Sequence, residues 1–189
     1  MVIIGISGKK ESGKTTLAEN LCVSLDMPGK NHTVIVSFAD KLKALTAELI
    51  FNMPPWTDDM KKAEIYGKTG REWLQIIGTD WFRTANPQCW IHAYQQQLET
   101  YKDLEQTFEA ENFYYIITPD VRFENEVEAI HNLGGVVIRL LRSPHADAHE
   151  SETALDSNKN FDCIIDNSNL TVDLTFGQAL AYLSKRGLI

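Results

Sequence analysis

The sequence predicts an α/β fold in which helices flank a five-stranded parallel sheet. Three observations lead to this prediction. Short apolar segments alternate along the chain with longer amphipathic ones. A glycine-rich loop joins the first apolar segment to the first amphipathic segment. The length of 189 residues suits one core and is too short for two ordinary domains. We therefore expect a single domain over residues 1–189, and any second unit should be an insertion within it.

The expected strands are short, rich in Val, Ile, Phe or Tyr, and bounded by turn residues: 2–7, 33–38, 113–118, 135–141 and 162–166. The expected helices have an apolar face that recurs every three to four residues: 14–26, 40–51, 70–84, 88–106, 122–133 and 172–185. Three of these helices separate the second strand from the third, where one crossover helix would suffice. We therefore expect a helical insertion over about 40–106, and a short polar lid over about 143–160.

Composition limits the classes of partner. The chain is 43% hydrophobic and 23% charged, which is typical of a soluble globular protein, and it has no apolar run of the roughly 18 residues that a membrane helix needs. A net charge of −8 argues against binding long nucleic acid through a basic surface. Small phosphorylated molecules need only a local cluster of cations, so they are the expected partners.

The compartment is predicted from the first residues and the cysteines. The N-terminal sequence shows no basic leader followed by a long apolar stretch and a cleavage site. Cys22, Cys89 and Cys163 are odd in number and far apart, which suits buried thiols better than disulfides. We expect a cytoplasmic protein.

The strongest local signal is the motif G-x-x-x-x-G-K-[ST] at Gly8–Thr15, placed between an expected strand and an expected helix. Glycines let such a loop fold around phosphate oxygens, and its N–H groups with the helix amino end favour an anion. The residues expected to bind the nucleotide here are Gly8, Lys9, Glu11, Ser12, Gly13, Lys14, Thr15 and Thr16. Lys14 would reach the transferred phosphate, and Thr15 would bind Mg²⁺. The alternative is an ordinary glycine-rich turn with an exposed lysine.

A second segment, residues 67–83, predicts an acceptor site on a helix. At about 100° per residue, one sector of roughly 120° carries Arg71, Gln75, Thr79 and Arg83. The opposite side is expected to face the core and carries apolar residues: Trp73, Leu74, Ile77 and Trp81. Guanidinium groups clasp phosphate and an amide can read a base edge, although a solvated helix face would look the same. Gly78 costs helix stability and suggests that something approaches closely there.

Two aspartates follow expected strands. Asp40 opens the helix after strand 33–38, where it either caps that helix or orients the acceptor and takes a proton, with Lys43 as a further phosphate ligand. Asp120 follows strand 113–118, where it is either a magnesium-organising carboxylate or the N-cap of the next helix.

Arginines near the strand ends are candidates for stabilising charge during phosphoryl transfer, which receives little covalent help from protein groups. Arg122 and Arg142 are the predicted catalytic cations, whereas Arg139 lies inside an expected strand, where a structural ion pair is an equal alternative. In the lid, the segment His149–Glu152 lacks the ligand spacing of a zinc site and favours a lid contact or a helix start.

Taken together, these residues resemble those of the bacteriophage deoxynucleoside monophosphate kinases, within the P-loop nucleoside monophosphate kinase superfamily. The resemblance extends over most of the chain through these segments: Gly8–Thr15, Phe38–Asp40 with Lys43, Gly70–Arg83, Asp120–Glu126, Gly134–Gly135 and His149–Glu152. It implies a P-loop kinase fold with an acceptor-binding helical insertion and a lid that begins near Arg142. It also implies that Asn167 contacts the donor adenine. One departure is Pro119, which stands directly before Asp120.

The resemblance implies in-line phosphorylation of a deoxynucleoside 5′-monophosphate by ATP with Mg²⁺. The catalytic residues would be Lys14, Arg122, Arg142 and Asp40, and the metal-binding residues Thr15 and Asp120. The acceptor-binding residues would be Asp40, Lys43, Arg71, Gln75, Thr79, Arg83, Asp120, Arg122 and Glu152.

Other functions remain open at this point. The segment Asp162–Asn167 is also similar to dephospho-coenzyme A kinases, so another small acceptor is the alternative reaction, and a non-catalytic nucleotide switch is the alternative class. A homodimer is compatible with the sequence. If the origin is a phage, the compartment would be the host cytoplasm.

Overall fold

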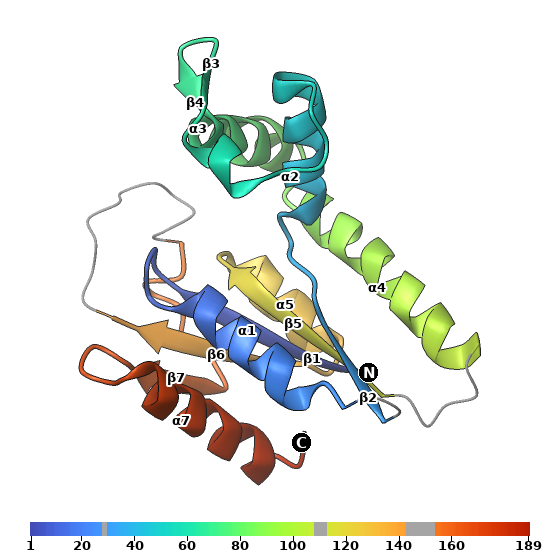
Figure 1. Ribbon diagram of the computed structural model, residues 1–189, viewed down its shortest axis with the longest axis vertical. Coiled ribbons are helices and arrows are strands. Elements are labelled where there is room, and N and C mark those ends of the chain that lie inside the picture. Colours follow the sequence, from blue (N-terminus) through green and yellow to red (C-terminus); the bar gives the residue numbers. More distant parts are fainter. Residues whose placement is uncertain (28–29, 108–112, 143–153) are drawn as a thin grey trace. The chain divides into compact units, whose positions relative to one another are not determined.

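The computed structural model describes residues 1–27, 30–107, 113–142 and 154–189 (Figure 1). The chain divides into two compact units. Unit 1 comprises Met1–Ser37 and Leu98–Ile189, and unit 2 comprises Phe38–Gln97. Unit 2 overlaps most of the expected helical insertion over about 40–106, and each unit is described by itself below.

Unit 1 contains the predicted five-stranded parallel sheet. Its strands, in spatial order, are β2 (Asn31–Ile35), β5 (Phe113–Val121), β1 (Val2–Gly8), β6 (Val136–Leu141) and β7 (Cys163–Asp166). Each neighbouring pair is parallel. The sheet confirms the predicted α/β class, and the central position of β1 places the glycine-rich loop at the middle of the carboxyl edge (Figure 1).

Two strand boundaries differ from the prediction. β2 begins two residues earlier than expected and its ladder ends where the Val36 N–H donates to the Ile117 carbonyl, at 3.0 Å, after which the chain leaves the sheet. β5 continues past its expected end at Thr118 and through Pro119. It does so because of a bulge: the step from Gly5 to Ser7 of β1 faces the longer step from Thr118 to Val121 of β5. A bulge leaves residues outside the regular ladder, which accommodates a proline that has no N–H to donate.

Helices cover both faces of the sheet. α1 (Lys14–Leu25) and α7 (Val172–Lys185) pack on one face, where the buried core includes Ile6, Leu21 and Leu183. α5 (Glu124–Asn132) packs on the other face, where Gly5 and Gly135 make room for Ile130. Side chains alternate between the two faces along each strand, so β1 and β6 contribute to both cores.

Unit 2 is helical. It contains α2 (Asp40–Thr46), the π-helix η1 (Ala47–Phe51), the 3₁₀-helix η2 (Asp58–Lys61), α3 (Gly70–Gln75), the π-helix η3 (Ile76–Arg83) and the first half of α4 (Cys89–Thr107). A short hairpin, β3 (Glu64–Ile65) with β4 (Lys68–Thr69), was not predicted. The core of the unit is formed by Leu42, Ile77 and Trp90.

All four tryptophans of the chain belong to unit 2: Trp56, Trp73, Trp81 and Trp90. Trp90 and Trp73 donate their indole N–H groups to the main-chain oxygens of Gly78 and Ile65, at 2.8 and 2.9 Å. Tryptophan fluorescence therefore originates in this unit alone. Among the described residues no helix is both long and apolar enough to cross a membrane.

Candidate active site

The glycine-rich loop joins β1 to α1 and contains three backbone conformations with positive φ. Gly8 has φ 155°, Glu11 has 61° and Gly13 has 92°. A Cβ at Gly8 would overlap the Ser12 hydroxyl and would lie 3.0 Å from the Leu140 carbonyl oxygen. Gly8 is therefore required both by its backbone angle and by the space around it. The left-handed Glu11 is an uncommon conformation for a residue with a side chain, and such conformations gather at functional sites.

The amino end of α1 is built to receive an anion. Its N-cap is Gly13, which provides no side-chain acceptor, and the first turn contains no acidic residue. Thr15 and Thr16 lie in this turn and are exposed. The helix amino end therefore keeps its partial positive charge without a carboxylate to offset it, which favours phosphate.

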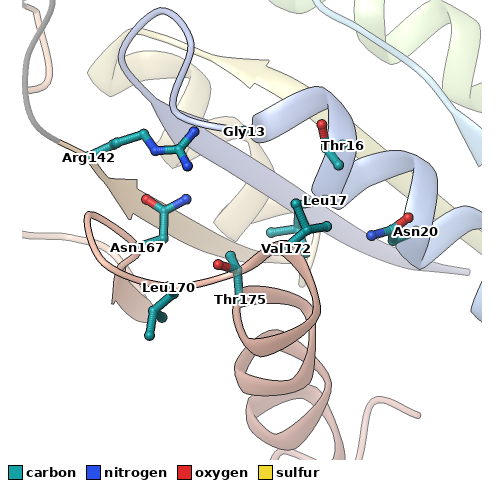
Figure 2. Close-up of a pocket in the computed structure, with 9 residues that line it drawn as sticks. All are labelled: Gly13, Thr16, Leu17, Asn20, Arg142, Asn167, Leu170, Val172 and Thr175. Carbon is teal, nitrogen blue, oxygen red and sulfur yellow. The ribbon is translucent and has the colours of Figure 1, made fainter.

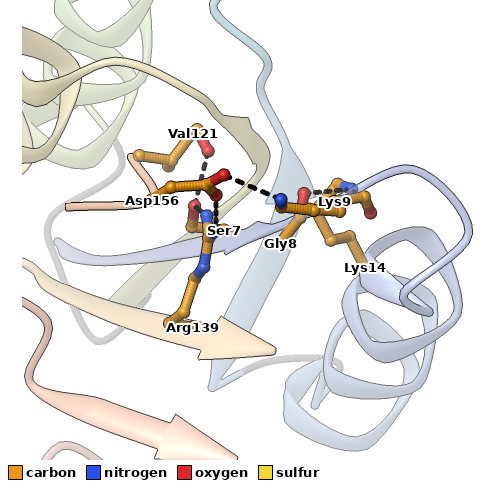
Figure 3. A network of polar contacts seen from close by, with 7 residues as sticks. All are labelled: Ser7, Gly8, Lys9, Lys14, Val121, Arg139 and Asp156. Atoms are coloured by element: carbon orange, nitrogen blue, oxygen red, sulfur yellow. Dashed lines mark hydrogen bonds and ion pairs between the residues drawn. The ribbon is translucent and has the colours of Figure 1, made fainter. Parts of the chain in front are cut away.

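Lys14 lies folded against its own loop (Figure 3). Its ammonium group donates to the main-chain oxygens of Gly8 and Lys9, both at 2.6 Å. The lysine charge is thus held at the concave side of the loop by neutral carbonyl groups. Phosphate oxygens carry more negative charge than carbonyls do, so a bound nucleotide would compete favourably for this ammonium.

Asn167 joins the end of β7 to the glycine-rich loop. The side chain is 4% exposed, and its Nδ2 donates to the Ser12 main-chain oxygen at 2.9 Å. Since that oxygen only accepts, the bond fixes which end of the amide is nitrogen. The Asn167 Oδ1 and the Ser12 hydroxyl are buried and have no hydrogen-bond partner among the described residues.

A cavity of about 70 Å³ opens beside Asn167 (Figure 2). Its walls come from the start of α1, the end of β6, the loop after β7 and the start of α7: Gly13, Thr16, Leu17, Asn20, Arg142, Asn167, Leu170, Val172 and Thr175. Arg142 also donates to the Glu11 main-chain oxygen at 3.3 Å. The mixture of apolar walls, two amides and one guanidinium suits the edge of a flat polar ring next to a phosphate loop.

A polar network runs beneath the loop (Figure 3). The Ser7 hydroxyl donates to the Val121 oxygen and accepts from Arg139 Nη1, both at 2.8 Å. Asp156 faces Arg139 Nη2 at 3.5 Å and Lys9 Nζ at 2.8 Å. Arg139 is therefore part of a structural ion pair, which was one of its two predicted roles.

The alternative roles of the two aspartates as helix caps are wrong. α5 has Phe123 as its N-cap, and the buried carboxylate of Glu126 accepts from the N–H groups of Arg122 and Phe123, at 2.7 and 3.1 Å. Glu126 thus does the capping, because its side chain reaches back over the first turn. Asp120 instead lies half-buried in β5, within the bulge. α2 has Ala39 as its N-cap and Asp40 as its first residue, where the Asp40 carboxylate faces Lys43 at 3.7 Å.

In unit 2, Arg71, Gln75, Thr79 and Arg83 are all half-buried on the continuous helix formed by α3 and η3. The capping box at its start uses Thr69 and Glu72, whose carboxylate accepts from the Thr69 N–H and hydroxyl, both at 2.7 Å. The Thr69 hydroxyl and then its N–H lower the pKa of Glu72. Because the pKa is lowered, the capping box stabilises the folded helix at pH values above the pKa of Glu72 in the unfolded chain. This stabilisation is lost as the pH falls through the pKa of Glu72 in the folded chain.

One expectation for this helix is wrong, and a second is met by the protein's own packing. Trp81, expected in the core, is 57% exposed, because the helix widens to a π-helix from Ile76 onward and the 100° spacing no longer applies. The close approach at Gly78 comes from the protein itself: an added Cβ would lie 2.5 Å from the Leu42 side chain. Gly78 therefore serves the packing of α2 on η3 and gives no support for a ligand.

Two comparisons with known proteins decide the family. The sequence profile of the deoxynucleotide monophosphate kinase family matches residues 56–176, more than half of the chain. A protein of Acanthamoeba polyphaga mimivirus, provisionally named deoxynucleotide monophosphate kinase, is 32% identical over 96% of this chain and 95% of its own. The chain belongs to this family. The family match begins after the glycine-rich loop, so it does not depend on that common motif.

Solved structures give weaker likenesses. A shikimate kinase from Aquifex aeolicus is 13% identical with a TM-score of 0.48, over 99% of both chains. A gluconokinase from Sinorhizobium meliloti has the same identity and TM-score over 97% of this chain and 92% of its own. Neither comparison bears on the acceptor of this kinase.

The kinase distributes its predicted site residues between the two units. Unit 1 brings together the loop residues with Arg142 and Asn167, and it carries Asp120 and Arg122 at the same edge of the sheet. Unit 2 carries Asp40, Lys43 and the four polar residues of the acceptor helix. Glu152 and most of the expected lid lie outside the described residues.

Sequence reasoning missed Asp156 and these cavity residues: Leu17, Asn20, Leu170, Val172 and Thr175. The cavity residues carried no motif. Asp156 lies in a polar segment in which nothing distinguished one carboxylate from another.

Proposed function

We propose that this kinase transfers the γ-phosphoryl group of ATP directly to the 5′-phosphate of a deoxynucleoside monophosphate. An acceptor phosphate oxygen forms a bond to the γ-phosphorus, the bond from that phosphorus to the β–γ bridging oxygen breaks, and ADP and a deoxynucleoside diphosphate leave. The observation that carries the proposal is the glycine-rich loop before the acid-free amino end of α1, in a chain of this kinase family.

The cations of unit 1 have defined roles in the proposed reaction. Lys14 would exchange the carbonyls of Gly8 and Lys9 for phosphate oxygens, which its contacts at the concave side of the loop support. Arg142, now bonded to the Glu11 oxygen, and Arg122, just after β5, would offset the charge that develops on the transferred group.

The residues at the carboxyl edge of the sheet suit Mg²⁺. Thr15 offers a hydroxyl in the first turn of α1, and Asp120 offers a carboxylate in the neighbouring strand, so both are the hard oxygen donors that this ion prefers alongside phosphate. When bound, Mg²⁺ would neutralise charge on the nucleotide phosphates. The role of Thr15 and Asp120 would be to hold it there.

Unit 2 would bind the acceptor. Arg71 and Arg83 would clasp the monophosphate, and Gln75 with Thr79 would bond to the base or sugar, which their half-burial along one helix supports. Asp40, ion-paired to Lys43, would orient the acceptor.

The proposal is tested by an ADP-release assay with MgATP and, separately, dAMP, dCMP, dGMP, dTMP, the matching ribonucleotides and dephospho-coenzyme A. Turnover with one or more deoxynucleotides supports it and shows the base range. Turnover with dephospho-coenzyme A alone would establish a kinase for a different acceptor. Nucleotide binding without transfer to any acceptor would establish a switch.

Asn167 is proposed to select adenine, since it lines the cavity beside the loop and its Oδ1 can accept from an exocyclic amino group, which guanine lacks at that position. Asn167→Ser is expected to lower kcat/KM for ATP by about tenfold and to lower the ratio of ATP to GTP use. The measurement is kcat/KM for both donors with a fixed acceptor. Asn169→Ser, two residues along the same loop and exposed, is the control and should keep the wild-type ratio. An unchanged ratio in Asn167→Ser would remove the residue from donor selection.

A further inference from the structure

Arg139 is a buried cation that the proposed reaction does not use. It is 7% exposed in the middle of β6, next to the strand that feeds the glycine-rich loop. Its guanidinium is held by the Ser7 hydroxyl at 2.8 Å and lies over the Phe161 ring, 5.4 Å from the centroid. It is fixed by the sheet and by residues on both sides, so it forms a rigid anchor beneath the loop.

Asp156 connects this anchor to the loop. One carboxylate oxygen faces Arg139 at 3.5 Å, and the other accepts from Lys9 at 2.8 Å. A lysine side chain has four rotatable bonds, and the carboxylate holds the end of this one. Asp156 therefore links Lys9 of the loop to the buried arginine of the sheet (Figure 3).

Lys9 in turn contacts the catalytic lysine. Its main-chain oxygen accepts from Lys14 Nζ at 2.6 Å and from the Ser12 N–H at 3.2 Å. A continuous set of contacts therefore runs from Arg139 through Asp156 and Lys9 to Lys14. The side chain of Lys9 is held by Asp156, and the main-chain oxygen of Lys9 accepts hydrogen bonds from within the loop.

The negative charge of Asp156 is unfavourable for a residue beside a phosphate-binding loop. A carboxylate beside a phosphate-binding loop repels the phosphates, which weakens nucleotide binding by electrostatics alone. The pair with Lys9 contributes little to folding, because the two side chains are 30% and 43% exposed and such pairs are screened by water. Asp156 is therefore unfavourable for the ligand by charge, and its pair with Lys9 adds little to stability. Its contact with the buried Arg139 fixes the geometry that it imposes on Lys9.

We propose that Asp156 is a positioning residue that holds the amino-terminal half of the phosphate loop in its binding conformation through Lys9. The inference rests on the proposed function only in taking the loop as the ATP site. It goes beyond that function by assigning a role to a residue distant in sequence from the loop, 147 positions from Lys9.

Positioning and electrostatics predict opposite signs for Asp156→Asn. This variant removes the negative charge and keeps the size. If repulsion dominates, ATP binds more tightly to the variant. If positioning dominates, the dissociation constant for ATP rises by about tenfold and kcat falls by roughly 10- to 100-fold, because small misplacements of reacting groups are costly. The affinity is measured by calorimetry with a non-hydrolysable ATP analogue and no acceptor, so it remains informative even if no deoxynucleotide is phosphorylated.

A double-mutant cycle with Lys9→Met tests the path. Lys9→Met keeps the length of the side chain and removes its charge. If Asp156 acts through Lys9, the affinity of the double variant is no weaker than that of the weaker single variant. If the increase in the dissociation constant of the double variant equals the product of the two single increases, the residues act independently, and this result would overturn the proposal.

Two exposed residues outside the site serve as charge-matched controls: Glu128→Gln on α5 and Lys159→Met in the segment after Asp156. Both should bind the analogue as the wild type does. Tighter or unchanged binding by Asp156→Asn would overturn the proposal, as would a lower melting temperature with unchanged affinity, since that pattern indicates a merely structural role. If Asp156→Asn does not fold, Lys9→Met alone decides: a wild-type affinity overturns the inference, and a weaker affinity that Lys9→Arg restores supports it.

Discussion

Lys14→Met is expected to lower kcat for phosphoryl transfer by about a thousandfold, the range in which a single charge-stabilising donor is lost from such reactions. The methionine keeps the length of the side chain and cannot donate to phosphate. In the folded protein the lysine donates to the neutral main-chain oxygens of Gly8 and Lys9.

The measurement is ADP release with saturating MgATP and the acceptor that the wild type uses. Lys185→Met, in the last turn of α7 and exposed, is the matched control and should retain wild-type turnover. A fall of less than tenfold in Lys14→Met would show that Lys14 does not carry the transferred charge. Circular dichroism of both variants checks that the loss is not due to unfolding.

Gly70→Ala is expected to destabilise unit 2 by about 3 kcal/mol, near the upper end of the usual cost of overpacking. The added methyl group would overlap the main-chain oxygen of Met60, and a backbone oxygen cannot rotate away as a side chain can. The Gly70 N–H also donates to the Ala63 oxygen at 3.0 Å, so the two segments are held close together. Because Gly70 begins the helix that carries Arg71, we also expect a higher KM for the acceptor and an unchanged affinity for ATP.

Urea unfolding followed by tryptophan fluorescence measures this change directly, because all four tryptophans lie in unit 2. Gly177→Ala is the control: it lies within α7 of unit 1 and nothing lies within 4 Å of its added Cβ, so the fluorescence transition of unit 2 should match that of the wild type. Coincident fluorescence transitions for Gly70→Ala and the wild type would contradict the expected overlap.

The parts of this molecule that follow from local sequence could be predicted. The alternation of strands with helices gave the five-stranded parallel sheet, and the motif at Gly8–Thr15 gave the loop, because both depend on neighbouring residues. Each of these features is specified within a few turns of helix or a single strand.

Features set by tertiary contacts could not be predicted. The bulge at Pro119 depends on the register between β5 and β1, and the exposure of Trp81 depends on a change from α- to π-helix. Asp156 meets Lys9 of the loop across 147 positions of sequence. Such contacts produce no periodic pattern in the sequence, because the residue types involved are common and only their positions in the folded chain bring them together.

The position of unit 2 in the chain has a consequence for how this kinase could change its acceptor. The chain leaves the sheet after β2 and re-enters it at β5. These two strands are neighbours in the sheet, and they pair from Asn31 opposite Phe113 to Ile35 opposite Ile117. A contiguous stretch of gene between adjacent strands can be exchanged by recombination while strand order and donor loop stay as they are. The acceptor-binding residues that lie in unit 2 could therefore be exchanged together while the ATP-binding loop stays unchanged.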